Sequence, residues 1–341
     1  MSFKLRVFIL SIVSLLSILL LSVLLYREAK EEFQQAQALE KSVVLSTKIS
    51  NLVHELQKER GRTAGYLGSG GQAFKEELLE QRKLTDQKII ELEKSLDKKF
   101  VSSLPEDAQE VFLSVILNKL NDLSEIRIKV DSGQISLQDA ISFYTQLNND
   151  LIDSVALLAR HTRSSTITRE LLAYADFMYA KEKAGLERAV LSVAFANKKF
   201  PTSELFTRFV DLMAQQKAFI NSFELAAPEN VRNYYEKLVK SSAPSLEVEN
   251  YERLALTSPF DGNLAVDPNQ WFTTVTKKID LMHTVESYIA KDLLERIKAF
   301  KEKAESKLTT TLFVSAVSAI IILLVAFLTL GFRERGTSKE G

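Results

Sequence analysis

Two arginines lie where the hydrophobic pattern predicts the buried face of a helix. Arg60 follows Leu52 and Leu56 at four-residue steps, and Arg188 follows Ala184 in the same way. Burying a guanidinium is costly unless an anion balances its charge. The planar guanidinium fork donates two parallel hydrogen bonds, which suits a flat oxyanion. The two positions therefore predict a site for a small anion between helices.

A structural role for both arginines is the alternative interpretation. Each arginine could pair with a carboxylate, or could bury its stem while its charged head reaches water. Glu59, Glu182 and Glu187 are the candidate acidic partners. The anion-site hypothesis instead requires both guanidiniums to lack a carboxylate partner. Gly61 and Gly65, one helical turn apart, would let another backbone or a ligand come close.

The composition argues against several other kinds of chemistry. The chain has no Cys, which excludes a disulfide framework, a Cys-based zinc site and a Cys nucleophile. We interpret the three histidines, His54, His161 and His283, as ordinary helix residues, and no Gly-x-Ser-x-Gly motif is present. With 44 basic and 44 acidic residues the net charge is zero, which gives no bulk attraction to nucleic acid. We expect neither an enzyme nor a nucleic-acid-binding protein, and neither a metal nor a cofactor.

Two uncharged segments flank the rest of the chain. Residues 7–26 and 308–332 are each long enough to cross the hydrocarbon core as a helix. No small-residue cleavage site follows the first segment, so we interpret it as an anchor rather than a cleaved signal peptide. Basic residues in the tails, 1–6 and 333–341, place both tails in the cytoplasm by the positive-inside rule. We expect residues 27–307 to lie in the periplasm or outside the cell of a bacterium.

The remaining sequence predicts an all-α fold. The chain has only 11 Gly and 6 Pro, and the alternating pattern of strands is rare. A stripe with helical period runs along a first helix that continues from the first membrane segment. The stripe consists of Leu45, Ile49, Leu52, Leu56 and Thr63.

Turn and capping residues predict where the later helices begin. The expected starts are about residue 72, Pro105, Ser136, Pro201, Pro228 and Pro268. Ser136 resembles the first member of a capping pair with Asp139, and Asp267 resembles the cap of the last helix. The second helix should end near Asp97, and residues 161–168 should divide a long helical run. Residues 241–267, which are rich in helix-breaking residues, should be the least regular segment.

An internal match at a shift of 128 residues suggests a duplication. Residues 59–61 align with 187–189, and residues 143–145 align with 271–273. Chance similarity between amphipathic helices is the alternative explanation. A duplication predicts two tandem four-helix bundles between the membrane helices. The two repeat units would be residues 30–163 and 164–307.

Three segments of the sequence resemble the NIT family of nitrate- and nitrite-sensing domains. Residues 52–67, LVHELQKERGRTAGYL, resemble the opening motif of the family. Phe74 with residues 81–86 resembles its second helix. Residues 180–189, AKEKAGLERA, resemble its central motif, which is the most specific of the three. The similarity covers most of residues 50–223.

The resemblance implies a fold, a ligand and a set of binding residues. The implied fold is a pair of four-helix bundles, and the implied ligand is nitrate or nitrite held by arginines from different helices. By their places in the motifs, Arg60 and Arg188 match this role. Arg62, two residues after Arg60, is a third candidate, and Arg253, in the segment expected to be irregular, is a fourth.

The chain departs from the usual architecture of the family. NIT domains usually precede a HAMP linker and an output module, but here residues 333–341 alone follow the second membrane segment. We therefore expect a membrane-anchored external sensor of nitrate, nitrite or a similar oxyanion without an output domain of its own. Its signal would pass through the membrane helices to a homodimer mate or a separate signalling partner. The alternative is a membrane-anchored helical scaffold for an envelope protein, in which the arginines form structural salt bridges.

Overall fold

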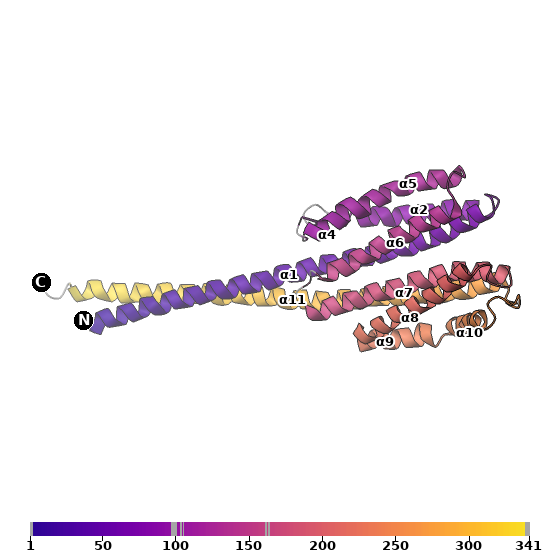
Figure 1. The fold of residues 1–341 in the computed structure, drawn as a ribbon. Coiled ribbons are helices and arrows are strands. Elements are labelled where there is room, and N and C mark those ends of the chain that lie inside the picture. The colour runs from indigo at the N-terminus through magenta and orange to yellow at the C-terminus, as the bar shows by residue number, and fades with distance from the viewer. Residues whose placement is uncertain are drawn as a thin grey trace. The chain divides into compact units, whose positions relative to one another are not determined.

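A computed structural model gives the fold for residues 3–96, 101–102, 104, 106–160, 162 and 164–337. Every regular element within these ranges is a helix, which confirms the predicted all-α fold (Figure 1). In chain order the elements are α1 (Phe3–Gly68), α2 (Lys75–Glu93), α4 (Glu106–Glu110), η1 (Val111–Ile116), α5 (Leu117–Asp131), α6 (Leu137–Arg160), α7 (Ser165–Ala196), α8 (Ser203–Ala226), α9 (Glu229–Tyr235), η2 (Glu236–Lys240), α10 (Ala243–Thr257) and α11 (Pro268–Thr337).

The chain forms two compact units, one of residues 1–40 with 295–341 and one of residues 41–294. In the first unit the start of α1 lies beside the end of α11. Lys307 Nζ donates to Glu32 Oε2 at 2.6 Å and to Glu28 Oε1 at 3.0 Å. These contacts hold the two helices together next to the uncharged segments.

Two helices in the described part of the chain could cross a membrane by length and composition. They are Ile12–Gly68 and Pro268–Val325, and they overlap most of both uncharged segments. The apolar side chains of the uncharged segments in these ranges are mostly exposed; Leu20 is 63% exposed and Phe313 is 70% exposed. Exposed leucines in such numbers are unusual for a surface that faces water.

The helices of the second unit fall into two groups with the same order along the chain (Figure 1). The first group contains the later part of α1, then α2, then the run α4–η1–α5, and then α6. The second group contains α7, then α8, then α9–η2 with α10, and then the first part of α11. The third member of each group includes a π-helical stretch, η1 or η2. This shared order supports the duplication, which remains a prediction.

Capping side chains set several helix starts as the sequence predicts. Ser136 Oγ accepts a hydrogen bond from the backbone N–H of Asp139 at 3.0 Å and donates to the Asp139 carboxylate at 2.6 Å. Thr202 caps α8, and Asp267 Oδ1 accepts from the backbone N–H of Asn269 at 2.9 Å. These contacts satisfy the free N–H groups of the first helical turn.

Other predicted boundaries differ from the structure or fall outside the described residues. Helix α2 begins at Lys75, three residues late, because Phe74 adopts a left-handed backbone with φ of 64°. The segment 241–267 contains the 15-residue helix α10. Pro244 lies in its first turn, where proline costs no hydrogen bond. Asp97, Pro105 and His161 lie outside the described residues.

The predicted stripe on α1 is buried. Leu45, Ile49, Leu52, Leu56 and Thr63 are each at most 1% exposed. On α11 the buried face includes Ile279, Met282, Ile289 and Leu293. The buried set also contains charged residues at unusual density, among them Glu59, Arg60, Lys181, Glu182, Glu187 and Glu286. Charged side chains that are buried in a core need partners of opposite charge or hydrogen-bond partners. These partners are described in the next subsection, because they decide which buried charges could bind a ligand.

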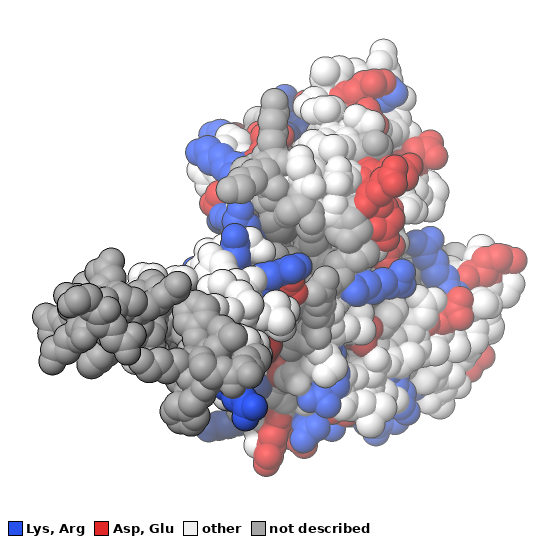
Figure 2. All heavy atoms as spheres, turned by 90° about the vertical axis from the view of Figure 1, so that its left-hand side faces the viewer, with Lys and Arg blue, Asp and Glu red and all other residues white. Residues whose placement is uncertain are grey.

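Charged side chains of both signs are interspersed with uncharged ones on the face that Figure 2 shows. This mixing agrees with the equal numbers of basic and acidic residues in the sequence. The charged residues considered as a candidate site are therefore the buried ones, inside the two groups of helices.

Candidate functional site

Helices α1 and α7 bring Arg60 and Arg188 together. Each guanidinium lies against a glycine of the opposite helix. A Cβ atom on Gly61 would meet Arg188 Nη2 at 3.4 Å, and a Cβ atom on Gly185 would meet Arg60 Nη2 at the same distance. The absence of a side chain at these two positions therefore leaves room for the two cations side by side.

Arg60 has a buried counter-ion. Its Nη1 donates to Glu182 Oε1 and its Nη2 donates to Glu182 Oε2, the second at 3.2 Å. Thr145 Oγ1 accepts a further hydrogen bond from Arg60 at 2.8 Å, and Gln57 donates to Glu182 at 2.7 Å. Glu182 is fully buried. The prediction that both guanidiniums lack a carboxylate partner is therefore wrong for Arg60, which forms a structural ion pair.

Arg188 differs from Arg60 in its contacts. Its Nη1 donates to Thr276 Oγ1 at 2.8 Å, and its Cζ lies 4.6 Å from the centre of the Phe272 ring. No carboxylate among the described residues forms an ion pair with it. Burial and the positive charge of Arg60 lower the pKa of Arg188 to about 10, against the weaker attraction of Asp280 and Glu182.

The local charge balance follows from these contacts. Two guanidiniums and the single carboxylate of Glu182 leave one positive charge among the groups in contact. A hydroxyl and an aromatic face contact Arg188, and neither neutralises it. A small anion between the helices would supply the missing charge.

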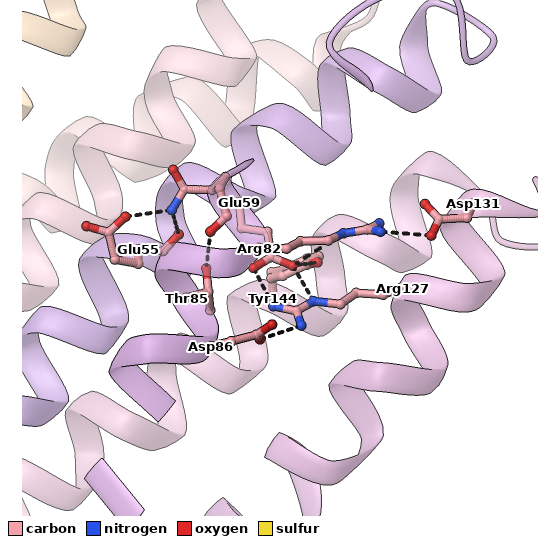
Figure 3. A network of polar contacts seen from close by, with 9 residues as sticks. Glu55, Glu59, Arg82, Thr85, Asp86, Arg127, Asp131 and Tyr144 are labelled. Carbon is pink, nitrogen blue, oxygen red and sulfur yellow. Dashed lines mark hydrogen bonds and ion pairs between the residues drawn. The ribbon is translucent and has the colours of Figure 1, made fainter. Parts of the chain in front are cut away.

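Glu59, the residue before Arg60, belongs to a separate network inside the first bundle (Figure 3). It accepts hydrogen bonds from Arg127 Nε at 2.8 Å, Arg127 Nη2 at 2.9 Å and Tyr144 Oη at 2.7 Å. Arg127 also donates to Asp86 at 2.6 Å. Glu59 is therefore occupied and does not balance Arg60 or Arg188.

A second buried polar layer joins α1, α7 and α11. Lys181 Nζ donates to Glu286 Oε2, and both side chains are fully buried. Ser50 Oγ donates to the same oxygen at 3.2 Å. The rings of His54 and His283 stack in parallel, 3.7 Å apart. Thus the buried His54 and the half-buried His283 form a stacked pair, a role that the sequence interpretation missed.

Comparison with known proteins identifies the family. The NIT family, described as nitrate and nitrite sensing, matches residues 51–294. The chain belongs to the NIT family. A nitrate regulatory protein of Klebsiella oxytoca is 28% identical over 287 residues, which covers 82% of this chain and 69% of the relative. The solved structure of the NasR transcription antiterminator matches with a TM-score of 0.72 at 22% identity, over 86% of this chain and 83% of that one, which shows a shared fold.

The central NIT motif can now be explained residue by residue. In AKEKAGLERA, Lys181 pairs with Glu286 and Glu182 pairs with Arg60. Gly185 makes room for the Arg60 guanidinium, and Arg188 forms no ion pair with a carboxylate in the described part of the chain. Glu187 points into the second bundle, where Gln216 donates to it at 2.8 Å.

The two other candidate arginines do not join the pair. Arg62 donates to Gln81 on α2, because two residues further along a helix turn the side chain to the other side. Arg253 is exposed and donates to Asn250 in its own helix at 2.7 Å. Thr145 and Thr276, which the sequence interpretation missed, contact the paired arginines instead.

Proposed function

We propose that this NIT protein senses nitrate, nitrite or a similar small planar oxyanion bound between Arg60 and Arg188. The observation that supports this most directly is the uncompensated Arg188 guanidinium, held beside a second cation. An anion there would form charge-assisted hydrogen bonds with the fork of Arg188 and relieve the repulsion between the two arginines. Membership of a family described as nitrate and nitrite sensing supports the same ligand class.

Binding would favour one packing of the helices over another. A ligand shifts a conformational equilibrium by its differential affinity for the two states. Arg60 comes from α1, Arg188 from α7, and Thr276, which orients Arg188, from α11. An anion that draws the arginines together therefore acts directly on the packing of these helices.

We further propose that α1 and α11 anchor the protein in a bacterial cell membrane, with residues 27–307 on the outside. The uncharged segments and their exposed apolar side chains support the membrane anchor. The basic residues in both tails support the orientation. The same two helices would carry the signal, to a homodimer mate or a separate signalling protein. We expect no catalytic activity and no binding of nucleic acid.

The test is calorimetric titration of the full chain in detergent with sodium nitrate and sodium nitrite, against sodium chloride. We expect saturable binding of nitrate or nitrite, and its loss in Arg188→Gln. Arg169→Gln removes an exposed arginine from the same helix and should bind as the wild type does.

The scaffold alternative makes the opposite prediction. If both arginines are purely structural, Arg188→Gln changes the melting temperature by the same amount with and without nitrate. Absence of binding heat together with absence of a nitrate-dependent rise in melting temperature would reject the sensor.

A further inference from the structure

The side chain of Arg188 extends along α11. At its base, Trp271 Nε1 donates to the backbone oxygen of Arg188 at 3.0 Å. Further along, Arg188 Cζ lies 4.6 Å from the centre of the Phe272 ring, and its Nη1 donates to Thr276 Oγ1 at 2.8 Å. The arginine therefore runs from the first turn of α11 toward the later turns, and its charged end lies at Thr276.

An acidic residue follows on the same face of α11. Phe272, Thr276 and Asp280 are spaced four residues apart, which places them in successive turns on one side of the helix. The first two contact Arg188, and Asp280 is the next in the direction of its guanidinium. Asp280 is exposed, and its carboxylate forms no hydrogen bond or ion pair with the described residues.

Two contacts between α7 and α11 bracket Asp280. Lys181 of α7 pairs with Glu286 of α11. Arg188, later on α7, reaches Thr276, earlier on α11, so the two helices are antiparallel. Because Asp280 lies between Thr276 and Glu286, it lies beside the part of α7 between Lys181 and Arg188. That part of α7 forms one side of the proposed anion site.

The charge of Asp280 acts on Arg188. Burial and the charge of Arg60 lower the pKa of Arg188, whereas Asp280, and to a smaller extent Glu182, act to raise it. Glu182 already pairs with Arg60. Asp280 is therefore close enough to influence the Arg188 guanidinium and too far to form an ion pair with it, in agreement with its place on α11.

The net charge of the proposed anion site depends on Asp280. Arg60, Arg188 and Glu182 together carry one positive charge. The half-buried Lys183 also interacts electrostatically with Arg60 and Glu182, and Asp280 offsets this further cation. These five groups therefore carry one positive charge in total, which a monovalent anion neutralises. A divalent anion would leave a negative charge uncompensated in a largely buried site, and that is costly.

The first bundle has no acid at the corresponding place. Thr145 of α6 contacts Arg60 as Thr276 of α11 contacts Arg188. Four residues after Thr145, the next turn of α6 carries Asn149, whose amide is uncharged. Asp280 thus adds its negative charge on the side of the arginine that has no carboxylate partner among the described residues.

We propose that Asp280 sets the charge selectivity of the anion site, so that the site takes a monovalent oxyanion such as nitrate and rejects a divalent one such as sulfate. This inference rests on the proposed function. Asp280 acts through the electrostatic field at Arg188 and does not itself hold the ligand. The same field weakens the binding of the monovalent anion, because the two negative charges repel each other.

The test is calorimetric titration of the full chain in detergent with sodium nitrate, sodium nitrite and sodium sulfate, at equal ionic strength kept with sodium chloride. Asp280→Asn should bind nitrate and nitrite about threefold to tenfold more tightly than the wild type and should gain saturable binding of sulfate. Asp280→Glu keeps the charge and should still reject sulfate. The control Asp211→Asn removes an exposed carboxylate of α8 and should bind as the wild type does.

Melting temperatures of the anion-free proteins show whether the fold is intact. Asp280 is exposed, so Asp280→Asn should melt close to the wild type. The inference is overturned if Asp280→Asn binds nitrate and nitrite no more tightly than the wild type, if it still rejects sulfate, or if the wild type binds sulfate as tightly as nitrate. Absence of nitrate and nitrite binding by the wild type would instead reject the proposed function, and this inference with it.

Discussion

Arg60 of α1 and Arg188 of α7 lie against glycines of each other's helix and have different electrostatic surroundings. Arg60 is paired with the buried carboxylate of Glu182, whereas a hydroxyl and an aromatic ring contact Arg188. At the scale of residues, this difference separates an arginine that forms a buried ion pair from one that has no carboxylate partner among the described residues.

The two arginines should therefore respond differently to the same substitution. Arg60→Gln leaves Glu182 buried without its cation, and such a loss costs about 3–5 kcal/mol of unfolding free energy. Arg188→Gln removes an uncompensated charge and should change stability little while abolishing nitrate binding. Urea unfolding and nitrate titration of both variants check this. Equal destabilisation by the two substitutions would contradict the assigned roles.

His54 should make stability depend on pH. Burial, and then the positive charge of Lys181, lower the pKa of His54 below its ordinary value of 6.5, so the folded protein keeps this histidine neutral. The unfolded chain takes up a proton below about pH 6.5, so the stabilisation is present above that pH and is lost as the pH falls. The loss is at most about 1.4 kcal/mol per pH unit.

Urea unfolding at pH 7.5 and pH 5.5 measures this effect. His54→Phe, which keeps a ring against His283, should lose less stability between the two pH values than the wild type does. Identical losses in the two proteins would show that His54 does not titrate on unfolding.

At the scale of elements, α7 connects the two bundles through successive polar residues. Glu182 faces Arg60 of α1, Lys181 faces Glu286 of α11, and Glu187 faces Gln216 of α8. Lys181, Glu182 and Glu187 point in different directions around α7, because they are one to six positions apart. A rotation of α7 about its axis would therefore change all three contacts. The helix therefore links the proposed anion site to the first part of α11.

The Lys181–Glu286 pair should be essential for this packing. Lys181→Met leaves a fully buried carboxylate without its cation, which we expect to cost about 3–5 kcal/mol. Lys181→Met combined with Glu286→Leu should recover much of the loss, since an apolar pair of similar volume needs no compensation. Denaturant unfolding of the single and double variants measures both effects. A double variant that is less stable than either single one would contradict this explanation.

At the scale of the whole molecule, the proposed sensor must convert anion binding into a change at the two helices that we propose to cross the membrane. In the unit formed by residues 1–40 and 295–341, Lys307 of α11 contacts Glu28 and Glu32 of α1. A change in how the two helices pack should alter the distance between these residues.

Cysteine cross-linking can detect such a change, because the chain has no native Cys. Glu32→Cys combined with Lys307→Cys removes an exposed ion pair worth about 0–1 kcal/mol, so the fold should persist. We expect nitrate to change the rate of disulfide formation in membranes, and Arg188→Gln to abolish that response. A rate that is the same with and without nitrate would refute signalling through this helix pair.

The sequence by itself determined the helical class, the two apolar segments, most helix starts and the family. These features are local: the apolar period of α1, the caps at Ser136 and Asp267, and the motif residues 180–189 can each be interpreted from neighbouring residues. It also indicated that Arg60 and Arg188 face inward, because helical spacing alone decides which side of a helix is buried.

The tertiary structure decided which charges meet. Glu59, Glu182 and Glu187 were equal candidates for pairing with the arginines, and the fold directs them to Arg127, Arg60 and Gln216 respectively. Helical spacing fixes the direction of a side chain on its own helix, but the contact depends on the rotation and register of the helix opposite. Those variables are set by packing across the bundle, between residues that lie 29, 68 and 122 positions apart in the chain in these three pairs.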